Sequence, residues 1–536
     1  MEKKLWFVGF ALLSVPFICY LLLSIVWLCG GVVNSYIFPA AFILSLLLYY
    51  IATAKQGRKD IMIGLLSIMF MIPLCCLIAY FAWDTSWDGH AYHQTIIYSL
   101  MDGWNPVYGE AHSYCYAGNT LYVNSYAKGI ESIAACIAST CNNLECGKAV
   151  NLIFLASSFF LSLGFLNDFL PNSSIVKRLL YSAIIAFSPV VACQMFTFYI
   201  DWALYIIVLD IALVLYRVEK HGLSFWEGLS LFMLLSLAIP FKFNIAFWGC
   251  LVVGLYWISL VIRKQYKQVK AIVYISVFSM LLGFCVLGFN PFIKNILNGH
   301  HPCYPVAGAG SEHTVEVINK NAPDIYKTNG PIKSIFISLS ARPSSSGEYH
   351  NPYVVKKIDF INSGYPDNRM GGFGFFSLEI FVLTLITILL YRKKEKNYYI
   401  FLLIESLLFV SLFILPWGWW ARFVAFFYLF PIISVLYAEK YEKSKCLKNI
   451  LNCLLIANMV ISIGTSSYMC YRISDDENKS IKILEDNQPA LIKCENDGFY
   501  FKLLKRDIQL IPCDTVTLRL PVTGPDVFVD KTLIKK

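Results

Sequence analysis

Long apolar segments follow one another along the chain and are separated by shorter polar segments. Runs of about 17–25 apolar residues are long enough to cross a hydrocarbon core of about 30 Å as α-helices. The pattern therefore predicts an all-α polytopic membrane bundle with about 13 transmembrane helices. The apolar runs lie at 5–29, 32–54, 61–82, 149–167, 179–198, 202–216, 225–240, 244–262, 271–289, 374–391, 398–415, 421–437 and 449–467.

The composition agrees with a membrane protein and excludes other classes. Of the 536 residues, 57% are hydrophobic and 15% are charged, and the mean hydropathy is +0.59. A soluble protein carries about 25% charged residues, so a soluble enzyme, a fibrous protein and a disordered chain are all excluded. The net charge of +9 does not indicate nucleic-acid binding, because the basic residues lie in short loops between the apolar runs, where they set orientation.

Lysine and arginine are concentrated in every second connection between the apolar runs. One alternating set of short segments holds 21 of them, whereas the short connections of the opposite set hold only Lys242 and Arg422. Positive residues accumulate on the cytoplasmic side, so we expect a cytoplasmic N-terminus and, with thirteen crossings, an extracytoplasmic C-terminal segment. The first run is too long for a signal peptide and lacks a cleavage site of small residues, so we expect it to be a retained anchor.

This topology places three long polar segments on one outward face, which makes that face the place to look for function. These segments are 83–148, 290–373 and 468–536. Several cysteines fall in them, and disulfides of unassigned pairing are expected if the face meets an oxidising compartment. The cysteines are Cys115, Cys136, Cys141 and Cys146 in the first segment and Cys494 and Cys513 in the last.

The chain divides into three parts on this basis. Residues 1–60 form two N-terminal membrane helices, and residues 61–467 form the main membrane region with two outward loops. Residues 468–536 become polar and predict a small α/β cap, with strands near 499–504 and 516–520.

The first outward loop opens with a dense group of titratable residues. Asp84 and Asp88 stand four residues apart, so they share one face if the preceding helix continues. Two close carboxylates suit a general base or the binding of a cation, and the other interpretation is an ordinary solvated helix end. His90 and His93 are placed to join Asp88 if a divalent metal ion is bound, which the sequence does not decide.

Further along the same loop, residues 121–138 form an amphipathic pattern. Lys128 and Glu131 interrupt otherwise apolar residues there. We expect this segment to be an interfacial helix that lies on the membrane.

Four more polar residues fall at the outward ends of later spans. Asp201 begins the sixth span, and Lys242 follows Pro240 at a break between two spans, where it either meets an anionic head group or snorkels to the surface. Arg369 precedes the tenth span and Arg422 the twelfth, and arginine binds phosphate through two parallel hydrogen bonds. Acids and guanidinium groups that meet at one membrane face suit a lipid-linked phosphate donor and an acceptor hydroxyl.

These residues resemble those of the GT-C superfamily of integral membrane glycosyltransferases. The resemblance is greatest to bacterial members grouped with protein O-mannosyltransferases and lipid A aminoarabinose transferases, and it covers roughly residues 60–440. The resemblance rests on Asp84 and Asp88 in the first outward loop, with the Tyr92-His93 pair, and on a second acid at the outward face, Asp201. The remaining matching stretches are Asn290-Pro291, Pro302-x-Tyr304-Pro305 and Trp420-Ala421-Arg422.

The resemblance implies inverting transfer of a sugar from a polyprenyl-phosphate donor to an acceptor hydroxyl of a cell-envelope glycan, lipid or protein. It places the enzyme in the bacterial inner membrane with its site facing outward. Asp84 would be the catalytic base, and Asp88 or Asp201 would orient the acceptor or the base. The expected substrate-binding residues are His90, Tyr92, His93, Lys242, Arg369 and Arg422.

Three other functions compete with this one. A polysaccharide polymerase or ligase that uses a lipid carrier would differ in the acceptor and in moving a chain. A transporter or flippase would place its polar site near the bilayer midplane between repeats, whereas these polar clusters lie at one surface. A purely structural scaffold would not need acids and arginines gathered on one side.

Overall fold

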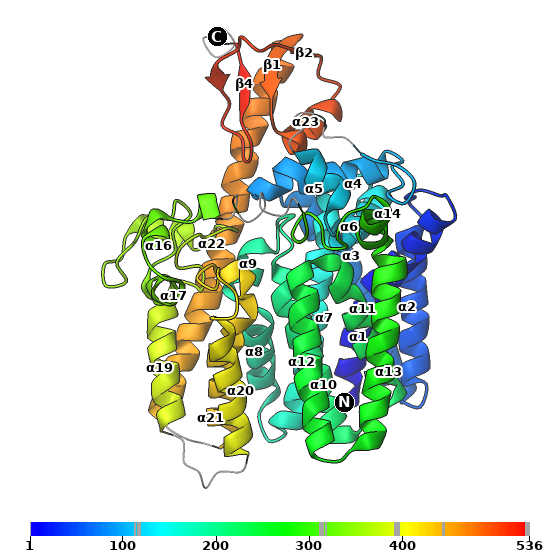
Figure 1. Ribbon diagram of the computed structural model, residues 1–536, viewed down its shortest axis with the longest axis vertical. Coiled ribbons are helices and arrows are strands. Elements are labelled where there is room, and N and C mark those ends of the chain that lie inside the picture. The colour runs from blue at the N-terminus through cyan, green and yellow to red at the C-terminus, as the bar shows by residue number, and fades with distance from the viewer. Residues whose placement is uncertain are drawn as a thin grey trace.

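The structure is a computed structural model that describes residues 2–111, 114, 119–309, 316, 319–390, 397–441 and 445–530. Cys115 and the basic residues within 391–396 lie outside the described residues. Helices stand side by side in a bundle, and a small domain, here called the cap, rises from one end of it (Figure 1). We refer to that end of the bundle as the cap side.

All thirteen apolar runs lie in helical segments. Among the described residues, six helices are long and apolar enough to cross a membrane, namely Leu5–Leu28, Arg58–Phe81, Leu144–Phe169, Phe243–Ile262, Tyr266–Leu287 and Lys445–Glu485. The helical bundle is thus compatible with a membrane protein, while the full count of thirteen crossings stays a prediction. The bundle helices are α1 (Glu2–Leu28), α2 (Ile37–Thr53), α3 (Arg58–Phe81), α7 (Ala149–Phe169), α8 (Ile175–Ala186), α9 (Pro189–Gln194), α10 (Trp202–His221), α11 (Phe225–Phe241), α12 (Phe243–Ile262), α13 (Tyr266–Leu282), α19 (Ser377–Leu389), α20 (Tyr398–Ser411), α21 (Leu429–Lys440) and α22 (Lys445–Glu485).

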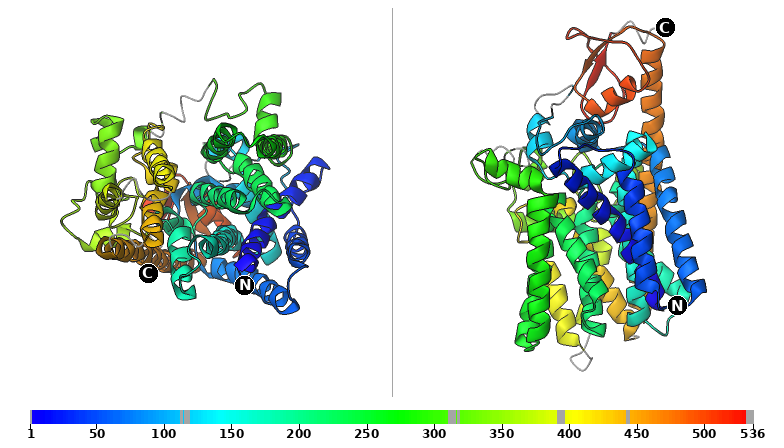
Figure 2. Two further views of the ribbon diagram at one scale, coloured as in Figure 1. Left: turned by 90° about the horizontal axis from the view of Figure 1, so that it is seen from below. Right: turned by 90° about the vertical axis from the view of Figure 1, so that its right-hand side faces the viewer.

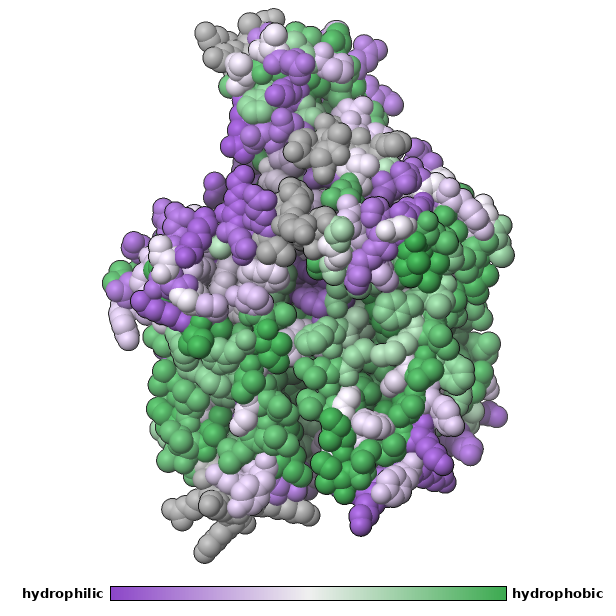
Figure 3. Space-filling model, viewed as in Figure 1, coloured by the Kyte–Doolittle hydropathy of each residue, from purple (hydrophilic) through white to green (hydrophobic). Residues whose placement is uncertain are grey.

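The surface of the bundle has the polarity that a bilayer requires. Hydrophobic residues form a broad belt over the helices in the face shown in Figure 3, and hydrophilic residues gather on the cap side and on the cap. Large apolar side chains of the bundle helices are exposed, for example Phe70 of α3 (66%) and Phe278 of α13 (61%). In water, apolar surface of this extent would drive association, so the belt is the expected lipid contact.

Two helix breaks carry residues to the cap side. The apolar run at 179–198 forms two helices because Ser188 caps the second one, accepting from the Val191 backbone N–H, with Pro189 at its first position. The predicted break near Pro240 is confirmed, since Lys242 is extended (φ −166°, ψ 143°) between α11 and α12. Both breaks leave a polar side chain between helices at the cap side.

The first outward loop folds into short helices against the bundle. They are η1 (Gly89–His93), α4 (Gln94–Met101), α5 (Thr120–Ser125), α6 (Gly129–Cys141) and η3 (Leu144–Lys148). The prediction of an interfacial helix is wrong, because residues 129–138 of α6 are all buried. Lys128 and Glu131 do not face water: Lys128 donates to Asn290 Oδ1 and to the Tyr126 carbonyl, and Glu131 contacts His93.

The later loops contribute short helices on the cap side as well. These are η4 (Gly283–Leu287), η5 (Phe289–Ile293), α14 (Lys294–Leu297), α16 (Asp324–Lys327), α17 (Pro331–Ser340), α18 (Lys357–Asn362), η6 (Ala421–Phe423) and η7 (Ala425–Tyr428).

The cap is built on the far end of α22. This helix has 41 residues and is about 60 Å long, twice the thickness of a hydrocarbon core, so it runs along the bundle and continues into the cap (Figure 2). The cap adds α23 (Asp497–Leu504) and a four-stranded sheet of order β2-β1-β4-β3. Its strands are β1 (Ala490–Cys494), β2 (Leu510–Pro512), β3 (Leu518–Arg519) and β4 (Val527–Val529).

The α/β character of the cap was expected, but one of its strands was not correctly predicted. Residues 499–504 form α23, whose N-terminus is capped by the Asn496 side chain accepting from Phe499 N–H. The helix buries two faces, with Phe499 and Leu503 in the cap core and Phe501 against the bundle. Apolar residues on opposite faces of a short helix give the alternation of a strand, which explains the error.

Candidate active site

A group of acids and bases from five distant stretches of sequence meets at the cap side around Arg422. Its Nη1 lies 3.4 Å from Asp88 Oδ2 and 3.7 Å from Asp201 Oδ2, and its Nε lies 3.6 Å from Asp367 Oδ1. The guanidinium also stacks over the Trp420 ring at 4.3 Å, a favourable cation–π arrangement. We call this group the Arg422 cluster, and its members are Asp88, Asp201, Asp367, Lys242 and Arg422.

Asp201 is the most buried carboxylate of the cluster. It is 2% exposed, it precedes α10, and it accepts hydrogen bonds from Lys242 Nζ and, at 3.4 Å, from Gln194 Nε2. Burial alone would raise its pKa, but Lys242 and Arg422 outweigh burial and hold the pKa of Asp201 below its ordinary value. The charge of Asp201 in turn raises the pKa of Lys242, although burial lowers it. Lys242 is therefore an ion-paired group of the cluster and not a snorkelling lysine.

Asp367 completes the cluster, although the sequence analysis did not select it. Trp420 Nε1 donates to Asp367 Oδ1 at 2.8 Å, and burial raises the pKa of Asp367 above its ordinary value. The sequence feature that could have identified Asp367 is its position two residues before Arg369. Arg369 itself makes no ion pair or hydrogen bond within the described part of the chain, but its charge acts on Asp367, so it lies near the cluster.

Asp84 has a different environment from the one predicted. Helix α3 ends at Phe81, so Asp84 and Asp88 do not share a helix face. Asp84 is fully buried, and its two oxygens accept from Ser86 N (3.0 Å), Ser86 Oγ (2.7 Å), Phe198 N (3.1 Å) and Gln94 Nε2 (2.9 Å). Three of these donors meet Oδ1 and one meets Oδ2, so hydrogen bonds hold Asp84 in place and it does not face solvent.

The assignment of Asp84 as the base stays a prediction. The contacts of Asp84 join the first loop to the segment that leads to Asp201. Asp88 is 20% exposed, and Arg422 at 3.4 Å is its ion-pair and hydrogen-bond partner within the described residues. Asp367 is 18% exposed and accepts from Trp420 at Oδ1, so Asp88 and Asp367 each keep an oxygen that is open to a substrate.

The histidines of the first loop point away from Asp88. His90 Nε2 lies 3.1 Å from the Asp84 carbonyl and His90 Nδ1 lies 3.3 Å from Asn496 Oδ1 in the cap, while His93 Nδ1 lies 2.6 Å from Glu131. Asp88, His90 and His93 therefore do not form a preformed metal site, and no group of three or more potential ligands is found among the residues that the structure describes. Tyr92 lies near enough to the cluster for the charge of Asp88 to act on it, since burial and this charge raise the pKa of Tyr92 well above its ordinary value.

A second buried charge network ties the cap to the first loop. Lys502 Nζ in α23 lies 2.6 Å from Glu477 Oε2 in α22 and 3.5 Å from Glu145 Oε1 in η3. Glu145 pairs in turn with Lys148 and accepts from the Asp84 backbone N–H at 3.2 Å. The position of the loop that carries Asp84 and Asp88 thus depends on contacts with the cap.

Replacing Lys502 with methionine is expected to destabilise the protein by about 3–5 kcal/mol, because it leaves the fully buried Glu477 carboxylate without its cation. The measurement is unfolding in detergent by heat or denaturant. Lys479→Met is the matched control, since Lys479 is 65% exposed and its pair with Asp475 is a solvent-exposed pair that contributes little to stability. Equal stability losses for the two variants would contradict the buried network.

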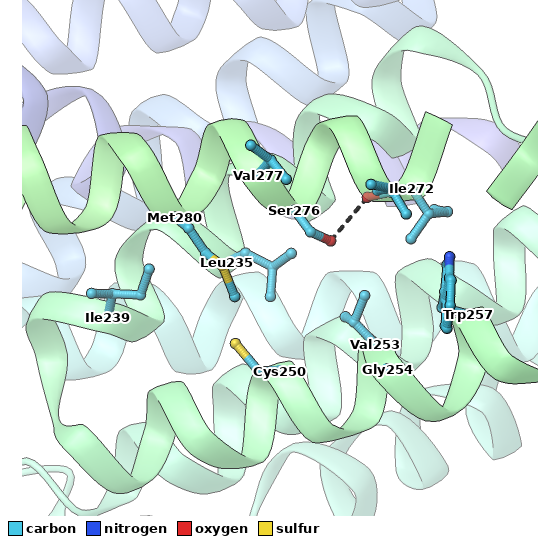
Figure 4. Close-up of a pocket in the computed structure, with 11 residues that line it drawn as sticks. Leu235, Ile239, Cys250, Val253, Gly254, Trp257, Ile272, Ser276, Val277 and Met280 are labelled. Carbon is cyan, nitrogen blue, oxygen red and sulfur yellow. Dashed lines mark hydrogen bonds between the residues drawn. The ribbon is translucent and has the colours of Figure 1, made fainter. Parts of the chain in front are cut away.

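Open space near the cluster is small, and a larger groove lies elsewhere. A cavity of about 20 Å³ borders Arg422. The groove between α11, α12 and α13 has about 270 Å³ but an apolar lining, and its Ser276 hydroxyl donates to the Ile272 carbonyl of its own helix (Figure 4). Figure 3 shows a furrow between the helices around α20 and those around α12, with hydrophilic residues recessed at its cap-side end.

The chain was also compared with known proteins. No family model, no curated protein and no solved structure matches it. The chemistry that the site can perform is therefore inferred from the contacts, burial and charges around Arg422.

Proposed function

We propose that the protein is a membrane glycosyltransferase that moves a sugar from a polyprenyl-phosphate donor to an acceptor hydroxyl at the extracytoplasmic face. The observation that carries the proposal is the Arg422 cluster. It combines two cations, which suit a lipid phosphate, with the partly exposed carboxylate of Asp88. Asp201 and Lys242 lie at ends of the bundle helices α10, α11 and α12. The motif resemblance to GT-C glycosyltransferases supports the same reaction.

In the proposed reaction, the acceptor oxygen attacks the anomeric carbon while the bond from that carbon to the phosphate oxygen breaks. Asp88 takes the proton of the acceptor hydroxyl, and the polyprenyl phosphate leaves with the bonding electron pair. Arg422 and Lys242 stabilise the charge that develops on the leaving oxygen. A single displacement of this kind inverts the anomeric configuration.

The same contacts suggest how donor binding prepares the base. In the free protein Asp88 is held by Arg422 at 3.4 Å, a long contact, while Asp201 keeps Lys242 as a close partner. A phosphate that binds Arg422 through two hydrogen bonds replaces the weaker Asp88 contact. Asp88 is then released beside the donor and is free to accept a proton.

Release of polyprenyl phosphate is the most direct test of this function. The purified protein is reconstituted in liposomes with a panel of polyprenyl-phospho-sugars and candidate acceptors. We expect sugar-dependent release of polyprenyl phosphate by the wild type and by the control variant Lys59→Ala, altered at the opposite end of the bundle. Addition of a growing chain would instead indicate a polymerase or ligase, and movement of intact donor between leaflets without cleavage would indicate a flippase.

A further inference from the structure

A second cavity lies beneath the cap, where α3 leaves the bundle. Its volume is about 320 Å³, which is within the range of small-ligand sites. Its lining comes from the last turn of α3, from α4, from residues 143–145 and from α23. None of the residues of the Arg422 cluster lines it.

One side of this cavity is aromatic and lies at the end of a candidate span. Tyr80 and Phe81 end α3 and are 47% and 71% exposed. Trp83 follows them, and Tyr98 stacks on Phe501 at 4.1 Å deeper in the lining. Tryptophan and tyrosine gather where membrane helices meet the head groups, so this wall is placed to contact lipid.

The opposite side is cationic. Lys502 lies in the last turn of α23, and Lys505 and Arg506 follow directly after the helix; all three line the cavity. Glu145 is the only acid in the lining, so the lining carries a positive balance.

The three cations differ in how far their charges are already neutralised. Lys502 is held by Glu477 and Glu145. Lys505 Nζ donates to the Asn142 carbonyl at 2.8 Å and has no carboxylate partner among the described residues. Arg506 pairs with Glu485 at 3.0 Å, but both side chains are more than a third exposed, and such a pair is weak. Lys505 and Arg506 are therefore available to an anion at the mouth of the cavity.

We propose that this cavity binds an anionic phospholipid of the surrounding leaflet. Its phosphate contacts Lys505 and Arg506, and one acyl chain lies over Tyr80 and Phe81 at the end of α3. A zwitterionic lipid offers the same chain but no net negative charge, so the site prefers anionic lipid. Such a lipid fastens the cap to the membrane surface, and this inference does not depend on sugar transfer.

The test is lipid binding by the full-length protein. Native mass spectrometry from detergent counts the lipids retained after titration with phosphatidylglycerol or with phosphatidylcholine. We expect the wild type to bind one phosphatidylglycerol about tenfold more tightly than phosphatidylcholine, and the double variant Lys505→Ala/Arg506→Ala to lose this preference.

The matched control is Lys479→Ala/Lys493→Ala, which removes the same charge from exposed positions of α22 and β1 outside the cavity lining. It should keep the preference for phosphatidylglycerol. A further variant, Phe81→Ser, should weaken the binding of both lipids equally, because it alters only the contact with the acyl chain. Equal affinities of the wild type for the two lipids would overturn the proposal, as would an unchanged preference in the Lys505→Ala/Arg506→Ala variant or its loss in the control.

Discussion

Asp88→Asn is expected to reduce the rate of sugar transfer by about 10²- to 10⁴-fold, the usual contribution of a general base. Asparagine has nearly the shape of aspartate and leaves the fold intact, but it takes no proton from the acceptor hydroxyl. The exposure of Asp88 and its single contact with Arg422 are the reasons for choosing it. The measurement is release of polyprenyl phosphate by the reconstituted variant, with folding checked by size-exclusion chromatography.

The Asp84→Asn variant should be compared with Asp88→Asn. The amide nitrogen of asparagine would face Phe198 N if it replaced Oδ1, or Gln94 Nε2 if it replaced Oδ2. A buried donor without an acceptor costs about 1–3 kcal/mol. We therefore expect a lower unfolding temperature and a loss of activity that follows the loss of folded protein. A stable but inactive Asp84→Asn protein beside a fully active Asp88→Asn protein would return the base to Asp84.

Removal of the Arg422 guanidinium is expected to have the second large effect. Arg422→Met leaves Asp88, Asp201 and Asp367 facing one another with Lys242 as the remaining ion-pair partner of Asp201 in the cluster. Breaking a buried ion pair from one side costs about 3–5 kcal/mol. The variant should be less stable and should bind the lipid-linked donor at least tenfold more weakly, as measured by donor titration and thermal unfolding.

Arg422→Lys distinguishes a phosphate clamp from a general need for positive charge. Lysine restores the charge but not the planar group that reaches three carboxylates and stacks on Trp420. We expect partial recovery of stability and little recovery of donor binding. Arg369→Met should have a smaller effect on stability, since Arg369 makes no ion pair in the described residues. Donor affinity of Arg422→Lys equal to that of the wild type would remove Arg422 from the phosphate site.

The sequence located the helices well because apolar runs of this length have few other ways to satisfy their backbone groups. It did not separate helices that cross a membrane from shorter ones. The run at 179–198 shows why, since Ser188 and Pro189 divide it without any fall in hydrophobicity. The interfacial interpretation of 121–138 failed because Lys128 and Glu131 find buried partners in remote segments.

Topology alone predicted that four polar residues gather at one end of the bundle, because helix ends on one side are neighbours. These residues are Asp88, Asp201, Lys242 and Arg422. Their individual roles did not follow. Whether a carboxylate is free depends on donors that the fold supplies, and Asp84 receives two of its donors from Phe198 and Gln94. Local patterns do not predict such contacts.

A structure of the protein with a non-hydrolysable polyprenyl-phosphonate sugar tests the central claim most directly. The account predicts the phosphonate within hydrogen-bond distance of Arg422 and Lys242, and Asp88 turned from Arg422 towards the acceptor side of the sugar. An analogue bound in the apolar groove between α11, α12 and α13, with the Arg422 cluster unchanged, would contradict it.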